Sequence, residues 1–526
     1  MNMSNDNNEL KLREDEEYEA EIDRMYFESL QEGKEYTKSS KIPLVVEKFV
    51  TNAVNQSINN EVPAMLAFYM LLGQICKDMV CIPAKTRRIG IRLQVIWMQT
   101  SGSGKTEMFN FIGPVSKRLF DTINERYGTD IQNFESNFGT IGEHDRENVG
   151  YDVQKIGDST DAALVGSPST EKETVVDDDT GRERTIEVPI QIYGQLEGEG
   201  LMVFDEFHDT GIFRQTQHKG QIIYYCNTLM NTLWGENWPI NKKLLNGDPF
   251  TCNSRRSMWA TTYIPRTLAT VITETGLMQR SIIYIREVPI EEQNEIRGKI
   301  ARDYGVIVDS GAPVESDADN LVQIYERLRE HYFESGEDPL RTITFGKGFS
   351  DAVTNETWKF QEFVQTSRPA VMEIANNFIT RMQGMMVKMA VLSCIAESGT
   401  TIKTKKNRYI VTERHVRQGA YITRQCYKSL VSWLDLALKA EHKSMQERAM
   451  VGEFKKAYAE LIETPNARTI DGEKWLNKTQ LIAHIMKNTR RGQAQVYRNY
   501  KKISDNYEER RVGRYGYVKM KRKDEQ

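Results

Sequence analysis

Apolar residues recur at helical spacing from Pro43 to Met79, which predicts a helical segment with Pro63 in the first turn of a helix. At residues 93–98 the pattern changes to LQVIWM, a short apolar run that predicts a buried strand. The glycine-rich sequence TSGSGKT follows, and helical spacing returns over residues 107–115. The order of strand, glycine loop and helix predicts an α/β unit, although Gly113-Pro114 should bend or interrupt the helix.

Three later apolar runs are also short enough to be buried strands. They cover residues 201–204, 258–263 and 281–288, and a helix is expected around residues 221–233. Before these runs, residues 172–193 hold two β-prone arms around a turn-forming stretch, which predicts an inserted β-hairpin. Strands that alternate with helices in this way predict a core built on a parallel sheet.

The sequence after residue 290 predicts two further regions with different secondary structure. Residues 291–440 contain few strand signals and several helical ones, so a helical lid is expected. After Lys478, two short helical segments and two β arms around residues 513–516 give the outline of a winged helix-turn-helix. The expected domains are an acidic, disordered tail (1–40), a helical lead-in (41–90), an α/β core (91–290), the helical lid (291–440) and a basic winged-helix domain (441–526).

Composition narrows the class of protein. The 526 residues exceed what one hydrophobic core usually serves, and no apolar run approaches the roughly 20 residues that a membrane span requires. The first residues hold neither a basic leader nor an apolar segment, which favours a cytoplasmic location without membrane partners. Six cysteines form no CxxC pair and do not group with the seven histidines, so neither a zinc module nor a disulfide framework is expected.

The two ends of the chain carry opposite charge. Residues 1–40 hold 12 acidic and 5 basic residues, a net charge of −7, whereas residues 478–526 hold 14 basic and 5 acidic residues, a net charge of +9. The acidic end has few large apolar side chains and is expected to be a mobile tail or a docking segment. The basic end suits contact with nucleic-acid phosphates.

The sequence SGSGKT at residues 101–106 carries the clearest chemistry. A glycine loop between a strand and a helix lets backbone N–H groups turn toward phosphate oxygens. Lys105 would reach the β and γ phosphates of ATP, and the Thr106 hydroxyl would be a ligand of Mg²⁺. Gln99 stands where this pattern usually has its first glycine. The candidate nucleotide-binding residues of the loop are Ser101, Gly102, Ser103, Gly104, Lys105 and Thr106.

A second motif, LMVFDE at residues 201–206, places two acids at the end of a predicted strand. Asp205 would hold a water of the Mg²⁺ shell, and Glu206 would polarise the water that attacks the γ-phosphate. An apolar run before two acids is common, and the glycine loop is what makes this one specific.

Further polar residues suit a motor that hydrolyses ATP between subunits. Thr261 or Thr262, at the end of the run at 258–263, is a candidate sensor of the γ-phosphate. Arg280 is a candidate arginine finger that acts on a neighbouring subunit's ATP, and Arg381 is a second candidate nucleotide sensor. For both arginines, a surface ion pair is the alternative.

Basic residues in three places are candidate contacts to DNA phosphates. The first pair lies in the loop before Leu244, the second lies just before the run at 258–263, and the rest lie in the terminal domain. A solvated basic surface is the alternative for each. The candidates are Lys242, Lys243, Arg255, Arg256, Arg490, Arg491, Arg498, Lys501, Lys502 and Arg514.

From about Val62 to Leu438 the chain resembles the helicase portion of phage and mobile-element primase-helicase proteins. The pieces that carry the resemblance are MLAFYMLLGQI, VIWMQTSGSGKT, TDAALVGSPS, VFDEF, WATTYIP, GLMQR and FITRMQGMMVKMAVL, in this order. A more distant likeness is to the minichromosome maintenance and superfamily 3 viral helicases. The resemblance implies an AAA+-like P-loop ATPase that forms a ring, expected to be hexameric, and translocates on single-stranded or forked DNA.

The resemblance thus implies a replicative helicase encoded by a phage or plasmid, working in the host cytoplasm. No primase-like acidic motif precedes the core, so priming is expected from a separate primase or polymerase. One alternative is a packaging motor of the terminase type, which would need a nuclease domain that residues after 291 do not predict. The other is an AAA+ assembly switch, initiator or loader that does not unwind DNA.

Overall fold

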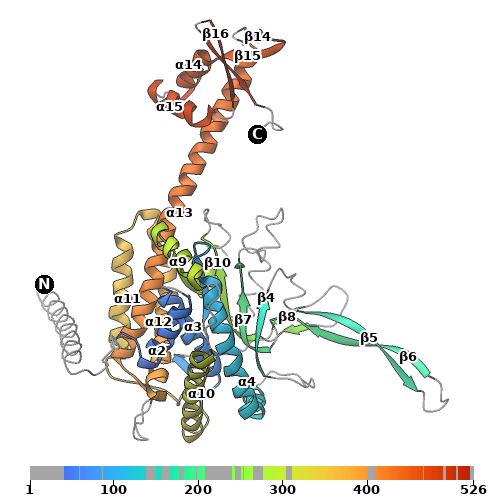
Figure 1. The fold of residues 1–526 in the computed structure, drawn as a ribbon, viewed down its shortest axis with the longest axis vertical. Helices are drawn as coiled ribbons and strands as arrows, with labels where there is room; N and C mark the ends of the chain where they lie inside the picture. The colour runs from blue at the N-terminus through green and yellow to red at the C-terminus, as the bar shows by residue number, and fades with distance from the viewer. Residues whose placement is uncertain are drawn as a thin grey trace, which may run out of the picture. The chain divides into compact units, whose positions relative to one another are not determined.

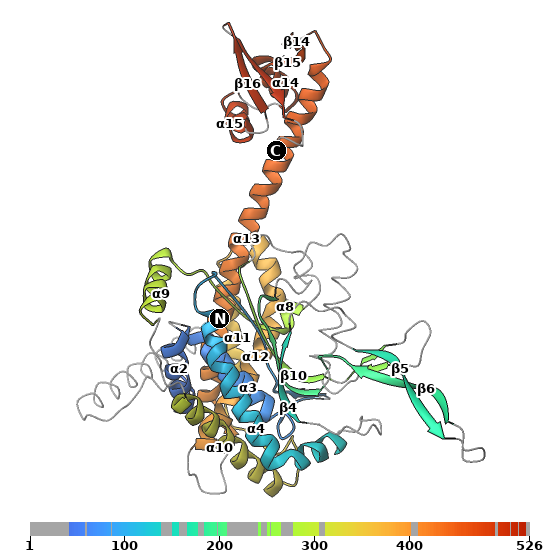
Figure 2. The ribbon, with the colours of Figure 1, turned by 45° about the vertical axis from the view of Figure 1, so that its right-hand side comes forward.

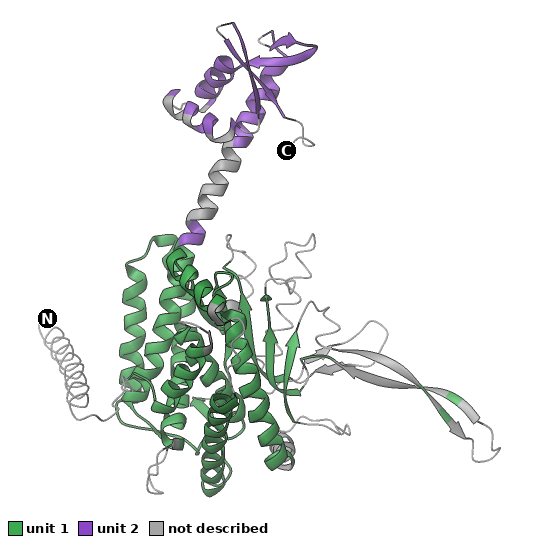
Figure 3. Cartoon of the chain, viewed as in Figure 1, with its two compact units in different colours: residues 1–435 green, residues 436–526 purple. Residues whose placement is uncertain are grey.

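The structure is a computed structural model of the chain (Figure 1). It divides into two compact units, residues 1–435 and 436–526, which are coloured green and purple in Figure 3 and described separately. The acidic segment 1–40 and the helix expected around residues 221–233 lie outside the described residues. The structure describes residues 41–521 apart from 58–59, 86, 138–149, 157–165, 177–182, 197, 208–239, 243–249, 253, 265–276, 304–310, 401–408, 490–492, 505–506 and 514.

The first unit is built around a five-stranded sheet with the order β11-β3-β10-β7-β4. Strands β10, β7 and β4 of this sheet are labelled in Figure 1. Its strands are β3 (Gln94–Gln99), β4 (Tyr151–Ile156), β7 (Gly198–Phe204), β10 (Ser254–Thr262) and β11 (Ile282–Arg286). Every neighbouring pair is parallel, and β3 and β10 are buried along their whole length, as is usual for parallel strands covered on both faces. The predicted α/β core with a parallel sheet is therefore confirmed.

All five strands end at the same edge of this sheet, here called the carboxyl edge, and begin at the opposite amino edge. Four of the strands were predicted from apolar runs. The fifth, β4, was missed because half of its sequence YDVQKI is polar, so it forms no apolar run; among the described residues this strand has one neighbour in the sheet, β7.

Three helices pack together beside the sheet: α2 (Leu44–Ser57), α3 (Glu61–Ile75) and α4 (Lys105–Asn137). The ring of Phe49 in α2 lies 5.4 Å from that of Phe68 in α3 and 5.6 Å from that of Phe111 in α4, centroid to centroid. Phe120 of α4 stacks on Tyr151 of β4 at 5.3 Å. Helix α4 therefore covers the sheet face on which Tyr151 lies.

Helix α4 continues through Gly113 and Pro114, so the predicted interruption at this pair is wrong. The proline removes one helical hydrogen bond, while the buried side chains of Phe111 and Val115 hold the helix to the core on both sides of it. The backbone instead leaves helical geometry at Tyr127, where φ is −135° and ψ is 16°.

Three antiparallel strand pairs accompany the sheet: β1 (Cys81–Ala84) with β2 (Arg87–Gly90), β5 (Gly166–Val176) with β6 (Glu183–Tyr193), and β8 (Ile240–Lys242) with β9 (Phe250–Cys252). The β5–β6 pair is the predicted inserted hairpin, seen as a long two-stranded ribbon in Figure 2. The β1–β2 pair was not predicted within the helical lead-in.

The region after β11 is mainly helical, as predicted. It contains α9 (Ile290–Asp303), α10 (Gly311–Glu334), α11 (Phe349–Gln365), α12 (Pro369–Thr400), α13 (Glu413–Ile462) and the short parallel pair β12 (Thr344–Phe345) and β13 (Ile410–Val411). Among the described residues, one helix, Pro369–Gly399, is long and apolar enough to cross a membrane by length and composition. Its most apolar window is 67% buried within the structure, and Met386, Met389 and Leu392 lie in the core.

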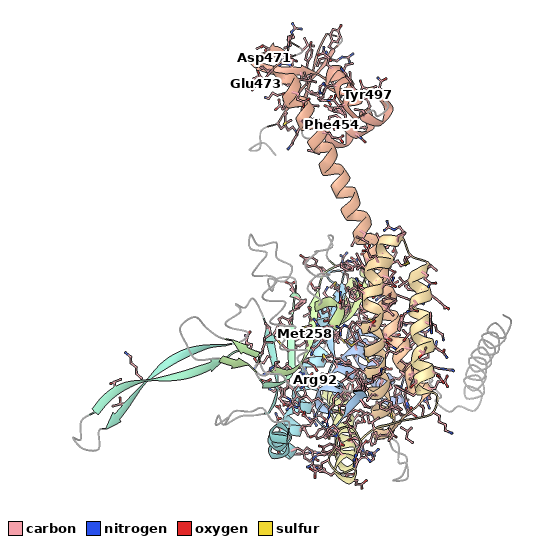
Figure 4. The ribbon with its side chains drawn as sticks, turned by 180° about the vertical axis from the view of Figure 1, so that it is seen from behind. Arg92, Met258, Phe454, Asp471, Glu473 and Tyr497 are labelled. Carbon is pink, nitrogen blue, oxygen red and sulfur yellow. The ribbon has the colours of Figure 1, made fainter. Side chains whose placement is uncertain are left out.

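The second unit contains a four-stranded antiparallel sheet with the order β14-β15-β17-β16. Its elements after α13 are β14 (Ala467–Ile470), β15 (Glu473–Asn477), α14 (Lys478–Thr489), α15 (Gln493–Ile503), β16 (Tyr507–Val512) and β17 (Tyr515–Met520). The two helices and the terminal hairpin were predicted, whereas the β14–β15 hairpin was not. Phe454, labelled in Figure 4, lies in the last turns of α13 and belongs to a separate core with Leu481, Val496, Tyr500 and Val518.

Candidate functional site

The glycine loop, residues 99–106, joins the end of β3 to the start of α4 at the carboxyl edge. Gly102 (φ 70°) and Gly104 (φ 86°) both adopt left-handed backbone conformations that side chains disfavour. Lys105 is the first residue of α4, and its ammonium donates to the carbonyl oxygens of Gln99 (2.8 Å) and Thr100 (3.2 Å). The first N–H groups of a helix have no partner inside it and attract anions. The loop therefore presents one lysine and a helix N-terminus at the same point.

Gln99 occupies the position at which loops of this pattern usually have their first glycine, and its side chain has a structural role there. Its side chain is completely buried, and its amide donates to the carbonyl of Ser103 (2.9 Å) and to Asn60 Oδ1 (3.0 Å). The amide oxygen accepts from the indole N–H of Trp97 at 2.9 Å. Asn60, the residue before α3, donates in turn to the carbonyl of Ser103 at 3.2 Å. The glutamine therefore holds the loop closed through hydrogen bonds.

The predicted acids follow β7 directly. Asp205 is partly buried, and its Oδ1 lies 3.4 Å from the Thr261 hydroxyl at the end of β10. Glu206 is exposed and has a φ of 56°, a left-handed conformation that costs a non-glycine residue free energy. Such strain occurs most often at functional sites. Of the two candidate threonines, Thr261 contacts Asp205, while Thr262 lies on the opposite face of β10, because side chains alternate along a strand.

The order of the strands brings these groups together. Strand β10 lies between β3 and β7, so Thr261 stands between the glycine loop and Asp205. Burial lowers the pKa of Lys105, while the negative charges of Asp205 and Glu206 oppose this shift, which indicates that all three charges interact across the site. Lys155, at the end of the unpredicted strand β4, adds a further cation 3.4 Å from Asp205 Oδ2.

A cavity of about 560 Å³ lies on the other side of the glycine loop, toward β11. Its walls include Glu61 at the start of α3, Tyr284 and Arg286 of β11, and Gln425 of α13. Arg286 is the register partner of Gln99, and it binds the Glu292 carboxylate with distances of 2.7 and 2.8 Å. The cavity is large enough for a nucleoside. It was not predicted, since its walls come from three distant segments of the chain, at residues 61–62, 284–295 and 425.

The two predicted arginine sensors approach one another. Arg280 ends the short helix α8 (Leu277–Arg280), two residues before β11 begins at Ile282. Burial lowers its pKa, and the positive charge of Arg381 on α12 lowers it further, so the two guanidinium groups interact. Arg280 lies at the amino edge, and the five residues of β11 separate it from the carboxyl edge by about 16 Å. That distance exceeds the reach of an arginine side chain.

Arg255 and Arg256 do not lie on a surface that DNA can reach. They are 8% and 4% exposed and sit near the start of β10, at the amino edge. Arg255 pairs with Asp78 and, at 2.9 Å, with Glu199, while Arg256 pairs with Asp152. This buried network pairs both arginines with carboxylates of the same chain, so the prediction that Arg255 and Arg256 contact DNA is corrected. A count of basic residues could not foresee the pairing.

The other candidate DNA contacts fall partly outside the described residues. Lys243, Arg490, Arg491 and Arg514 lie there entirely, and for Lys242 in β8 and for Arg498 and Lys502 in α15 the backbone alone is described. Lys501 is exposed on α15, as is Tyr497 four residues earlier, labelled in Figure 4. These two side chains lie on neighbouring turns of one helix face.

No family model matches the chain, and no curated protein sequence matches it. Fold and site thus define an α/β protein whose five-stranded parallel sheet carries a glycine loop and two acids at its carboxyl edge. Among the described residues, no three His, Cys, Asp or Glu side chains gather into a metal site. The Thr106 hydroxyl and the Asp205 carboxylate are nevertheless the hard oxygen donors that suit Mg²⁺ next to a bound phosphate chain.

Proposed function

We propose that the chain is an ATP-hydrolysing motor of the P-loop, AAA+-like class, and that it works as a replicative DNA helicase in a ring of identical subunits. The observation that carries the proposal is the meeting of Lys105, Asp205 and Thr261 at one edge of a parallel sheet. In open α/β sheets, ligands bind outside the carboxyl ends of the strands. Each residue there has the chemistry that phosphoryl transfer requires.

Within this site the glycine loop would bind the phosphates. The N–H groups of residues 101–106 and the Lys105 ammonium are the donors, and Lys105 would exchange its two carbonyl partners for phosphate oxygens. Thr106 and Asp205 would hold Mg²⁺, which when bound neutralises charge on the phosphate oxygens. Glu206 would take a proton from the attacking water, and Thr261, or Thr262 beyond it, would sense the terminal phosphate.

The position of the acids also determines where the base and ribose of the nucleotide would bind. The acids and Thr261 lie on the β10 and β7 side of the glycine loop, so the terminal phosphate belongs there. The base and ribose then extend toward β11, where the 560 Å³ cavity lies. Its lining of Tyr284, Glu61 and Gln425 offers an aromatic ring and groups that accept or donate hydrogen bonds to a base.

The position of Arg280 supports a shared active site. At the amino edge Arg280 is too far from the glycine loop of its own chain to reach a bound phosphate. Together with Arg381 it would supply positive charge to the nucleotide of a neighbouring subunit, where an arginine stabilises the transferring phosphoryl group. Hydrolysis would then require an oligomer, and a closed ring, expected to be a hexamer, gives every site a neighbour.

We further propose that the second unit works as a winged helix, and the order of its elements supports this. Helices α14 and α15 are followed by the β16–β17 hairpin, and β15 pairs with β17 beside them. In such a domain α15 would be the helix that approaches DNA, and Lys501, Lys502 and Arg498 lie on it. The +9 charge of residues 478–526 favours binding to phosphates.

ATP turnover with and without single-stranded DNA tests this proposal, together with displacement of a labelled strand from a forked duplex. We expect DNA to stimulate turnover, Lys105→Ala to lower it at least a hundredfold, and Arg280→Ala to lower it by about a thousandfold. Arg297→Ala is the matched control, since Arg297 is an exposed arginine on α9 and should behave as wild type.

Mixing Lys105→Ala with Arg280→Ala tests whether Arg280 acts on the nucleotide of a neighbouring subunit or on that of its own chain. Each mixed ring would contain some interfaces with an intact Lys105 facing an intact Arg280, so turnover should partly return. A terminase-type packaging motor would instead require duplex DNA and cut it. Turnover that ignores DNA and displaces no strand would reject the helicase in favour of an assembly switch.

A further inference from the structure

Lys155 is a charged residue beside the predicted acids that no sequence motif indicated. It lies on β4, and its ammonium is 3.4 Å from Asp205 Oδ2 and 5.6 Å from the centre of the Phe109 ring. An ammonium within about 6 Å of an aromatic ring is attracted to the face of the ring. Lys155 is therefore held between the candidate metal ligand and helix α4.

The fold places this lysine beside the phosphate-binding lysine. Phe109 follows Lys105 by four residues in α4, and residues with this spacing are neighbours on one helix face. On the sheet, Lys155 is the register partner of Val203, so side-chain alternation puts Lys155, Asp205 and the Tyr151 ring on the face that α4 covers. Lys155 and Lys105 thus flank Asp205 from two different elements.

The ion pair between Lys155 and Asp205 has little structural value. The two side chains are 59% and 41% exposed, and exposed ion pairs contribute little to stability. A bound Mg²⁺ at Asp205 would repel the ammonium, because like charges at a few ångströms are strongly unfavourable in a partly buried site. A lysine side chain is flexible, so its ammonium can move to the nearest anion. With nucleotide bound, that anion is the terminal phosphate.

We propose that Lys155 is a second phosphate-binding lysine, which leaves Asp205 when Mg²⁺ and a nucleoside triphosphate bind and then contacts the γ-phosphate. This inference rests on the proposed nucleotide site. It makes Lys155 a catalytic residue, since its charge would oppose the negative charge on the transferring phosphoryl group. It also gives the protein a means to distinguish triphosphate from diphosphate, because only the triphosphate carries the group that Lys155 reaches.

The test compares binding of two nucleotides to the full chain in the presence of Mg²⁺, by calorimetry. The probes are ADP and the non-hydrolysable analogue adenosine 5′-(β,γ-imido)triphosphate, and the variants are Lys155→Met and Lys155→Arg. We expect Lys155→Met to weaken the triphosphate analogue about tenfold or more, as for the loss of one charge-assisted hydrogen bond. Binding of ADP should change less than about twofold, and Lys155→Arg should restore most of the loss.

A matched control is Lys117→Met, because Lys117 is an exposed lysine on the same helix as Lys105. It should leave both affinities unchanged. Equal weakening of both nucleotides by Lys155→Met would overturn the inference, since Lys155 would then not distinguish the γ-phosphate. Tighter binding of the triphosphate analogue would also overturn it and would make Lys155 only a competitor of the metal at Asp205. Wild-type protein that binds neither nucleotide, or binds no better than Lys105→Ala, would refute the proposed function itself.

Discussion

Gln99→Gly would restore the glycine that loops of this pattern usually carry at that position, and we expect it to damage the protein. The glutamine side chain has no exposed surface and makes three hydrogen bonds, to Asn60, to the carbonyl of Ser103 and from Trp97. Glycine removes all three at once. The indole N–H of Trp97 would then be left in the core without its acceptor.

The expected loss can be estimated from these contacts. Three buried hydrogen bonds contribute about 1 kcal/mol each, and the indole N–H left unsatisfied adds roughly 1–3 kcal/mol. The free energy of unfolding of the first unit should therefore fall by roughly 4–6 kcal/mol. The loop would also lose its link to Asn60, so nucleotide affinity should fall together with stability.

Denaturant unfolding of Gln99→Gly, Gln99→Met and Asn60→Ala measures these contributions. Methionine has nearly the volume of glutamine, so Gln99→Met loses the hydrogen bonds without opening a cavity, and the difference between the two variants isolates packing. The double variant Gln99→Met/Asn60→Ala should lose less stability than the sum of the losses of the two single variants, since the two side chains share one hydrogen bond. A Gln99→Gly protein within about 1 kcal/mol of wild type, or one that binds nucleotide more tightly, would refute this account of the loop.

Three further predictions concern stability. Glu199→Gln should lower the free energy of unfolding by about 3–5 kcal/mol, because Lys77 and Arg255 would share a buried site with one carboxylate fewer. The exposed control Glu315→Gln should lower it by less than about 1 kcal/mol. Equal losses in denaturant unfolding would contradict the buried network. Burial raises the pKa of Asp317 from 3.8 to about 6, so its contribution to stability is fully present below pH 3.8 and is lost as the pH rises through 6. Asp317→Asn should then raise stability at pH 7.5 by roughly 2–3 kcal/mol and flatten the pH dependence between 4 and 6, and pH profiles parallel to wild type would count against it. Gly200→Ala should prevent folding of the first unit, because the added Cβ would lie 2.0 Å from the Asp152 carbonyl oxygen. The control Gly298→Ala on α9 should be tolerated, since nothing lies within 4 Å of its added Cβ. If Gly200→Ala is obtained in wild-type yield as soluble protein that melts cooperatively, this prediction is wrong.

The sequence predicted those strands whose apolar side chains form a local signal. The runs at 93–98, 201–204, 258–263 and 281–288 correspond to β3, β7, β10 and β11. Strand β4 and the β14–β15 hairpin were missed because half or more of the residues in each strand are polar. Strands β4 and β15 also depend on pairing with strands distant in the chain, β7 and β17. The order of the strands within the sheet could not be predicted either, because it depends on pairing between distant parts of the chain.

The site shows the same division between local and distant information. The glycine loop and the acids could be found from sequence, because each motif is contiguous and joined to one element. Three contacts could not be found from sequence, because each joins residues more than thirty positions apart. They are Gln99 with Asn60, Lys155 with Asp205, and Arg280 with Arg381. The buried pairs of Arg255 and Arg256 reversed a prediction that depended on charge alone.

The sequence by itself determined where phosphate and metal chemistry can occur, because backbone-dominated loops and strand-end acids are specified by neighbouring residues. Only the tertiary structure decided which charges are available. Burial at the amino edge matches Arg255 with Asp78 and Glu199, while the carboxyl edge leaves Lys105, Lys155 and Asp205 partly exposed around one point. The physical reason is that the free energy of a charge depends on its solvation and on neighbours that folding brings from elsewhere in the chain.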